Sequence, residues 1–411
     1  MRIIDIKEYA DLKNIFKNLK VDPYGIKIML PKAFFRLVYI DKLDSISANI
    51  LKQQSLSLGA DVAISRGTIT GEDKTTGCLL FANLSQYKKL IEKLKRQPFG
   101  LDKFAKELFL SLNNYQKESF VIKLNRHTLR INKRALIMGI VNLTPDSFSG
   151  DGLYKNSKFE TRNSKLKDEI PKIIEYVEKM VEDGADIIDL GGQSSRPSAR
   201  PVPVEEELRR TIPVIKKLAK KIKVPLSIDT YRPQVALQAL DNGVSIINDI
   251  TGLRNPQMLN VLKKYKAGIV IMHMKGMPAT MQINPQYESL LDEIILFLGR
   301  AIKKAKDQGI EEERIIIDPG IGFGKALKHN LLLLKALREF KILGRPILVG
   351  PSRKSFIGKL LNLEPPERLF GTLASVCLAV INGARIVRVH DVKETKQAIA
   401  VLDKILRISY S

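Results

Sequence analysis

Apolar and polar positions follow a regular pattern from Ala135 to the end of the chain. Short runs of apolar or β-branched residues are each followed by a longer stretch in which apolar residues recur every three to four positions. A run that is apolar throughout is typical of a strand buried on both faces, and the longer stretches are typical of amphipathic helices. The runs lie at residues 135–141, 186–190, 225–229, 245–249, 268–273, 314–319, 346–350 and 385–390.

Eight such strand–helix units predict a closed (β/α)₈ barrel. An open doubly wound sheet would also alternate, but it would not need eight units, and no GxGxxG motif follows the first strand. The fold class is therefore α/β, a TIM barrel preceded by a smaller α+β domain. The predicted helices lie at about 168–182, 204–220, 232–241, 256–265, 287–308, 329–340, 354–381 (broken at Pro365-Pro366) and 393–406.

Residues 1–134 lack this regular alternation. Short apolar runs such as 34–40 and 78–83 mix with helix-period stretches at 85–95 and 101–112, which predicts a small α+β domain. We place the domain boundary at residue 134, with the barrel at 135–411. No motif in the first domain indicates its role.

The charge of the chain raises three kinds of partner. It carries 68 Lys+Arg against 44 Asp+Glu in 411 residues, a net charge of +24, and half of the excess lies in residues 1–134. This balance favours nucleic acid, an anionic membrane surface or a phosphorylated small molecule. The chain lacks helix-turn-helix, RRM and zinc-finger patterns, which argues against nucleic acid. The apolar runs are also too short to span a membrane.

The cysteines and the N-terminal sequence indicate in which cellular compartment the protein is expected. Cys78 and Cys377 fit neither a disulfide framework nor a zinc site, and they suit a reducing cytoplasm. The first 25 residues alternate charged and apolar positions, so no signal peptide is expected. We therefore expect a cytoplasmic protein.

Polar or charged residues stand at or just after the end of every predicted barrel strand. Taken singly, such a residue is most simply a helix cap or a turn residue. Active sites of TIM barrels are built at these carboxyl ends, so the coincidence at eight strands predicts a site there. The residues are Asn142, Asp189, Asp229, Asn248, Asp249, His273, Asp318, Ser352 to Ser355, Arg388 and His390.

Arg388, His390 and Asn142 become neighbours if the barrel closes between its first and last strands. An arginine fork suits phosphate oxygens, and an amide oxygen is an acceptable Mg²⁺ ligand. This corner therefore looks like a metal–phosphate or pyrophosphate site. The alternative for His390 is a buried histidine bonded to the backbone.

The acceptor groups Asp229, Asn248 and Asp318 are expected on the opposite side of the barrel mouth, together with Lys354. A buried carboxylate must be paired. Its partner could be Lys354, or a ligand with several adjacent N–H groups such as a 2-amino-pyrimidinone ring. An internal salt-bridge network is the alternative.

The segment DPGIGFGK (318–325) is a Gly-rich loop that lacks the ending of a P-loop. Its glycines suit close approach of backbone to a flat ring, with Phe323 as an apolar wall. Ser355 opens the next helix, where free N–H groups suit a carboxylate or phosphate. No nucleophile–base pair or HExxH motif stands out, so the site looks built for positioning and electrostatics.

Eight motifs, one in each strand–helix unit and in order, resemble the dihydropteroate synthase family over essentially all of residues 135–411. The resemblance implies a TIM barrel, usually a homodimer, in folate synthesis. It implies that 6-hydroxymethyl-7,8-dihydropterin diphosphate is joined to p-aminobenzoate, with release of pyrophosphate and help from Mg²⁺. The motifs are MGIVNLTPDSFSGDG (138–152), GADIIDLGGQSSRP (184–197), SIDT (227–230), INDITG (247–252), MHMKGMP (272–278), DPGIGFGK (318–325), GPSRKSFIG (350–358) and RVHDV (388–392).

The resemblance also implies residue roles. Asn142 would be the metal ligand, and Arg388 and His390 would bind the diphosphate. Diphosphate would leave first, and the amine would then attack the cation at the pterin methylene. The pterin set would be Asp229, Asn248, Asp318 and Lys354, and the p-aminobenzoate side Ser195, Arg196, Pro197, Phe323, Lys354 and Ser355, with Gly322 and Met274 among the substrate-binding residues.

Two features depart from the family pattern, and two alternatives stay open. Gln193 and Ser195 stand where the family more often has Glu and Thr, and the basic stretch 153–167 is longer than usual. One alternative is a pterin-dependent methyltransferase that passes a methyl group to a corrinoid protein. The other is a synthase that uses a ribosylated aminobenzene acceptor.

Overall fold

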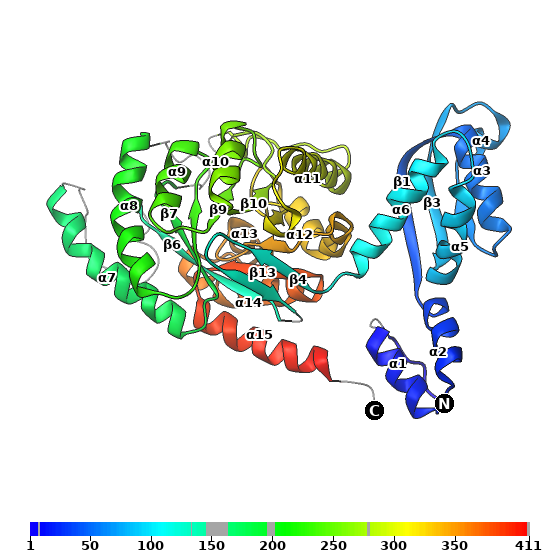
Figure 1. The fold of residues 1–411 in the computed structure, drawn as a ribbon, viewed down its shortest axis with the longest axis horizontal. Helices are drawn as coiled ribbons and strands as arrows, with labels where there is room; N and C mark the ends of the chain where they lie inside the picture. The colour runs from blue at the N-terminus through cyan, green and yellow to red at the C-terminus, as the bar shows by residue number, and fades with distance from the viewer. Residues whose placement is uncertain (7–8, 133, 145–162, 195–201, 278–279, 409–411) are drawn as a thin grey trace. The chain divides into compact units, whose positions relative to one another are not determined.

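The computed structural model describes residues 1–6, 9–132, 134–144, 163–194, 202–277 and 280–408 (Figure 1). Internal contacts divide the chain into two compact units, residues 1–113 with 404–411, and residues 114–403. The division precedes residue 134, because a hairpin at residues 120–131 belongs to the larger unit. No helix of the described residues is long and apolar enough to cross a membrane.

The larger unit is a closed barrel of parallel strands, as the sequence predicts. Closure is made by β13 and β6, where Arg388 pairs with Met138 in the register. The described residues form eight barrel strands, in the order β10-β11-β12-β13-β6-β7-β8-β9. They are β6 (Leu136–Asn142), β7 (Ile187–Gly191), β8 (Leu226–Asp229), β9 (Ile246–Asp249), β10 (Gly268–Met272), β11 (Ile315–Asp318), β12 (Ile347–Val349) and β13 (Ala384–Val389).

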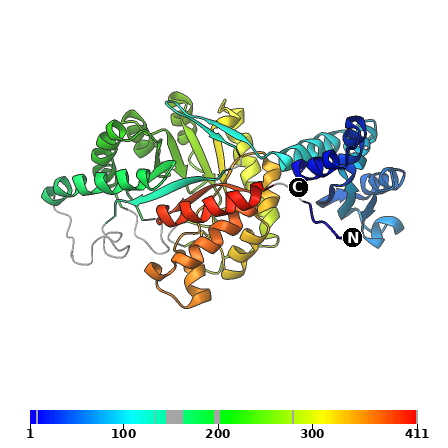
Figure 2. The ribbon, with the colours of Figure 1, turned by 90° about the horizontal axis from the view of Figure 1, so that it is seen from below.

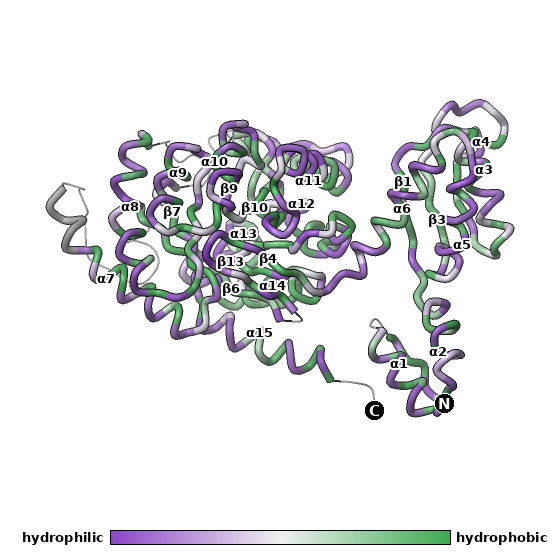
Figure 3. Tube along the Cα trace, in the orientation of Figure 1, coloured by the Kyte–Doolittle hydropathy of each residue, from purple (hydrophilic) through white to green (hydrophobic). Residues whose placement is uncertain are grey.

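Helices surround the strands (Figure 2). Many show apolar and polar positions in alternation along the tube, α15 most plainly (Figure 3). Their apolar sides pack on the outer surface of the barrel and form the largest hydrophobic cluster of the molecule. They are α7 (Asn163–Glu182), α8 (Val204–Lys221), α9 (Pro233–Asp241), α10 (Gln257–Tyr265), α11 (Leu290–Asp307), α12 (Leu327–Lys335), α13 (Ser355–Leu361), α14 (Leu369–Ile381) and α15 (Val392–Arg407), with short 3₁₀ segments η3 (Glu312–Arg314), η4 (Leu337–Leu343) and η5 (Pro365–Glu367).

The hairpin of β4 (Phe120–Lys123) and β5 (Thr128–Ile131) closes the amino-terminal end of the barrel. Ile122 and Ile131 are almost fully buried. They pack against the inward-facing side chains of the barrel strands, so the barrel interior and the hairpin form one core. Those inward residues are Leu136, Met138, Ile187, Ile246, Val270, Ile316, Leu348 and Ile386.

The smaller unit is an α+β domain with its own core, as predicted. Its antiparallel sheet has the order β1-β3-β2. Leu51, Leu80, Tyr87 and Leu90 are buried in its core. Its elements are α1 (Tyr9–Asn18), α2 (Pro23–Met29), η1 (Leu30–Lys32), β1 (Phe35–Asp44), α3 (Ser45–Leu56), β2 (Asp61–Ala63), α4 (Arg66–Thr70), β3 (Thr75–Asn83), α5 (Leu84–Leu94) and α6 (Leu101–Gln116), whose last residues belong to the larger unit.

Candidate active site

Arg388 lies at the centre of a buried charge cluster at the carboxyl ends of the strands. From β13, its Nε donates to Asp189 Oδ2 at 2.6 Å, and its Nη2 donates to Asp229 Oδ2 at 2.9 Å. We expected Arg388 in a corner opposite the acids, but the structure places it directly on them. The reason is the length of the arginine side chain, which crosses the barrel mouth from β13 to β7 and β8.

Asp189 connects this cluster to β9. Its Oδ2 also accepts a hydrogen bond from Asn248 Nδ2 at 3.1 Å, and its side chain is fully buried. Its second oxygen, Oδ1, has no hydrogen-bond partner among the described residues. The sequence prediction gives Asp189 no role, although it lies near the carboxyl end of its strand, as Asp229 does.

Asp318 and Lys354 face each other beside the Gly-rich loop. The Oδ1 of Asp318 accepts from the Gly320 backbone N–H at 2.7 Å. The Lys354 ammonium donates to the Ile321 carbonyl and lies 4.5 Å from the centre of the Phe323 ring. Lys354, Phe323 and Asp318, which the sequence predicts for one site, are therefore brought together.

Burial sets the protonation of these groups. It raises the pKa of the Asp229 carboxyl to about 7, against the lowering effect of Arg388. It also raises the pKa of Asp318, which Lys354 opposes. In Lys354 burial lowers the pKa to about 8, and the neighbouring Asp318 works in the other direction. The cluster therefore changes its charge near neutral pH.

Two positions of the loop require glycine because other atoms of the protein lie close to the backbone there. Gly320 has a φ of +74°, and a Cβ there would lie 2.0 Å from the His273 carbonyl oxygen. Gly322 has a φ of +82°, and a Cβ there would lie 2.9 Å from Lys354 Cδ. Larger residues would clash or be strained at both positions. The Gly-rich pattern therefore serves packing of the loop against β10 and Lys354.

His390 is held by the loop that follows β12. Its Nδ1 lies 3.0 Å from the Ser352 hydroxyl, and its backbone N–H donates to the same oxygen at 3.3 Å. In the same loop Arg353, with a φ of +55°, bonds Asp391 at 2.5 Å. Ser352 and Arg353, which precede α13, are thus bonded to His390 and Asp391, which directly follow β13.

The remaining predicted residues fall into three groups. Asn142 ends β6 with its Oδ1 beside Gly191, where an added Cβ would lie 3.6 Å away. Met274 is buried in an apolar cluster against which Phe323 packs, and Ser355 is exposed at the start of α13. Ser195, Arg196 and Pro197 lie outside the described residues.

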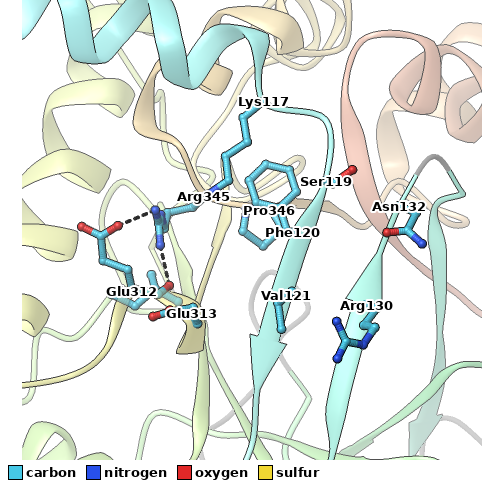
Figure 4. A pocket seen from close by; sticks show the side chains of 11 residues that line it. Lys117, Ser119, Phe120, Val121, Arg130, Asn132, Glu312, Glu313, Arg345 and Pro346 are labelled. Carbon is cyan, nitrogen blue, oxygen red and sulfur yellow. Dashed lines mark hydrogen bonds and ion pairs between the residues drawn. The ribbon is translucent and has the colours of Figure 1, made fainter.

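A pocket of about 280 Å³ lies at the other end of the barrel (Figure 4). In it Arg345 donates to the Glu312 backbone oxygen and carboxylate, both at 2.6 Å. These residues precede β11 and β12, so the pocket is separate from the charge cluster. Its lining is Lys117, Ser119, Phe120, Val121, Arg130, Asn132, Glu312, Glu313, Ile315, Arg345 and Pro346.

Comparison with known proteins matches the barrel. The model of the pterin binding enzyme family matches residues 138–390. A Synechocystis dihydropteroate synthase is 46% identical over 277 residues, which cover 67% of this chain and 91% of the relative. The chain belongs to the dihydropteroate synthase family. Among solved structures, the Xanthomonas albilineans dihydropteroate synthase with 4-aminobenzoic acid has a TM-score of 0.63 and 38% identity, covering 71% of this chain and 99% of that one.

One relative of the family also matches the smaller unit. A probable bifunctional folylpolyglutamate synthase/dihydropteroate synthase of Halobacterium salinarum is 36% identical over 402 residues. The match covers 97% of this chain and 46% of that protein. An extension like residues 1–113 therefore occurs with a dihydropteroate synthase barrel in another protein.

Proposed function

We propose that this dihydropteroate synthase family member condenses 6-hydroxymethyl-7,8-dihydropterin diphosphate with p-aminobenzoate, forming 7,8-dihydropteroate and diphosphate in folate biosynthesis. The observation that carries the proposal is the buried cluster of Arg388, Asp189 and Asp229 at the barrel mouth, beside Asp318 and Lys354. The chemistry is a transfer of the pterin-methyl group from diphosphate to an aromatic amine.

The buried acids suit this chemistry. Departure of diphosphate leaves a positive charge that spreads from the methylene into the pterin ring, and the carboxylates of Asp229 and Asp318 favour that charge in a site of low dielectric. Arg388 has five N–H donors and bonds the acids with two of its nitrogens, so donors remain for a phosphate oxygen. Ser352 contacts Nδ1 of the His390 imidazole, and we propose this ring as a second group that binds the diphosphate. No protein nucleophile is required.

Mg²⁺ is the metal that we propose for the reaction. Among the described residues no group of three or more His, Cys, Asp or Glu could hold a metal ion. Asn142 offers one neutral amide oxygen, and Mg²⁺ is commonly held by one or two protein groups together with substrate phosphates. The donor set therefore fits Mg²⁺ bound with the diphosphate, whose charge the ion would neutralise when bound.

A direct assay tests the reaction. Purified protein is incubated with the pterin diphosphate, Mg²⁺ and either p-aminobenzoate or its ribosylated analogue, and diphosphate and the condensed pterin are measured. We expect equal amounts of both products with p-aminobenzoate. No release of diphosphate with either acceptor would overturn the proposed function, and turnover with the ribosylated compound alone would change the acceptor.

The activity should have a narrow pH optimum. Ionised Asp229 is the active form, and because burial raises its pKa to about 7, kcat/KM should rise as pH increases through 7. Protonated Lys354 is the active form, and because its pKa is lowered to about 8, kcat/KM should fall as pH increases through 8. Lys354→Arg keeps its charge to higher pH. The falling limb should therefore move upward in that variant, and an unmoved limb would contradict the assignment to Lys354.

We also propose that the protein is a cytoplasmic homodimer. The helix α14 is apolar on both its buried and its outer side: Phe370, Leu378 and Ile381 are 80%, 43% and 42% exposed. A row of exposed apolar residues on one helix is typical of an interface between subunits. In light scattering after gel filtration, the wild-type protein should have the mass of a dimer and Phe370→Glu that of a monomer. A monomeric wild-type protein would contradict the proposal.

A further inference from the structure

The Gly-rich loop after β11 is held by side chains at six consecutive carbonyl groups. Irregular backbone needs partners for its polar groups, and surface loops usually find them in water. Here, residues from three other segments donate to the loop, together with Lys325 of the loop itself. The carbonyl of Ile321 accepts from Lys354, that of Gly322 from Gln282, that of Phe323 from Lys325, that of Gly324 from Tyr287, and those of Lys325 and Ala326 from Asn330.

Lys325 is the most buried of these donors, with 2% of its surface exposed. Its Nζ lies 3.0 Å from the Phe323 carbonyl oxygen, 3.0 Å from His273 Nδ1 and 3.4 Å from the His273 carbonyl oxygen. Burial lowers the pKa of His273 far below its usual value, so its ring is neutral and can accept a hydrogen bond. Lys325 Nζ therefore has three acceptors within hydrogen-bond distance, and the two at 3.0 Å, Phe323 O and His273 Nδ1, can be served by the amine in either protonation state.

No carboxylate forms an ion pair with Lys325 among the described residues, although burying an amine without full compensation is costly. Burial lowers the pKa of the Lys325 amine well below its usual value, and Asp318 opposes this only through space. A methionine would fill the same volume without that cost. We therefore attribute the presence of an amine at this position to its hydrogen bond with the Phe323 carbonyl oxygen.

Tyr287 holds the next residue of the loop. Its hydroxyl donates to the Gly324 carbonyl oxygen at 2.8 Å. Its ring is fixed in turn by the Lys275 ammonium, 4.2 Å from the ring centre, and by the His329 ring at 5.0 Å. Lys325 and Tyr287 thus fix two successive peptide groups of the loop.

We propose that Lys325 and Tyr287 are positioning residues for the aromatic acceptor. By fixing the peptide groups of residues 323 and 324, they hold the Phe323 ring beneath the Lys354 ammonium, where p-aminobenzoate binds. This role rests on the proposed function and adds two residues that have no contact with the reacting atoms. The pterin is held by Asp229, Asn248 and Asp318, so its binding should depend far less on this support.

Steady-state kinetics with both substrates varied test the role. Lys325→Met and Tyr287→Phe are compared with Lys328→Met and Tyr265→Phe. Lys328 is exposed on α12, and the Tyr265 hydroxyl bonds Asp241 at the exposed end of α10. We expect Lys325→Met to raise the KM for p-aminobenzoate about tenfold or more and Tyr287→Phe severalfold, in line with the loss of one or two hydrogen bonds. The KM for the pterin diphosphate should change by less than about twofold.

The outcomes distinguish failure of the positioning role from failure of the proposed function. Equal increases in both KM values, or none in either variant, would overturn the positioning role. If Lys325→Met does not fold, Tyr287→Phe decides alone, because it removes one hydroxyl and leaves the ring in place. An inactive wild-type protein would instead overturn the proposed function. The two control variants should match the wild-type protein in both KM values.

Discussion

Replacing Arg388 with methionine should lower kcat/KM by a factor of about 10³ or more and also destabilise the fold. The catalytic loss follows because one preorganised donor to a developing charge commonly contributes 10² to 10³, and Arg388 in addition positions Asp229. The stability loss follows because Asp189 and Asp229 would remain buried without their cation, which costs about 3–5 kcal/mol. Turnover assays and urea unfolding measure the two effects.

Arg385 provides a matched control on the same strand. It forms an ion pair with Glu118 near the start of β13, and its side chain is 10% exposed against 17% for Arg388. Arg385→Met should therefore lower the free energy of unfolding without a comparable loss of kcat/KM. Adding Asp189→Asn to Arg388→Met should restore part of the stability and none of the activity. Equal catalytic losses in the two arginine variants would refute the assignment of Arg388 to the site.

A chain that begins at residue 114 should fold into an active barrel, whereas one that begins at residue 135 should not. The second truncation removes the β4–β5 hairpin and exposes the interior core that Ile122 and Ile131 close. Burial of each isoleucine contributes about 1.5–3 kcal/mol, and a domain has only about 5–15 kcal/mol in total. Soluble yield, the urea midpoint and turnover of both truncated proteins check this.

Substitution in the full-length chain separates the hairpin from the rest of the deleted segment. Ile122→Ala should cost about 2–5 kcal/mol by leaving a cavity between the hairpin and the barrel. Val121→Ala, on the exposed side of the same strand, should cost much less. If the chain from residue 135 is as stable as the chain from residue 114, the hairpin does not complete the core.

The barrel was predictable because strands buried on both faces leave a strong signal in the sequence. All eight apolar runs became barrel strands, and the break at Pro365-Pro366 separates α13 from α14 at η5. The hairpin was not predicted, because two strands of four residues are too short to leave a clear pattern of apolar positions, and the boundary at residue 134 left it out of the barrel. Its place in the barrel core is decided by tertiary packing.

The rule for strand ends predicted that Asp229, Asp318 and Lys354 lie together, because each follows a buried run, and the structure brings them together. The rule did not predict how the charged groups pair. The bonds of Arg388 to two acids depend on the path of a long side chain across the barrel mouth, which spacing along the chain does not encode. The support of the loop by Lys325 and Tyr287 likewise depends on residues far apart in the sequence.

The second oxygen of Asp189 has a consequence for handling the protein. Among the described residues this buried oxygen has no hydrogen-bond partner, which destabilises the ligand-free protein, and neighbouring Asp229 is desolvated as well. A ligand that donates hydrogen bonds to these acids relieves that cost in the native state only. Its binding free energy then appears as added resistance to heat. A rise in melting temperature can therefore show that a ligand has bound the acid cluster. Compounds can be screened in this way without a turnover assay.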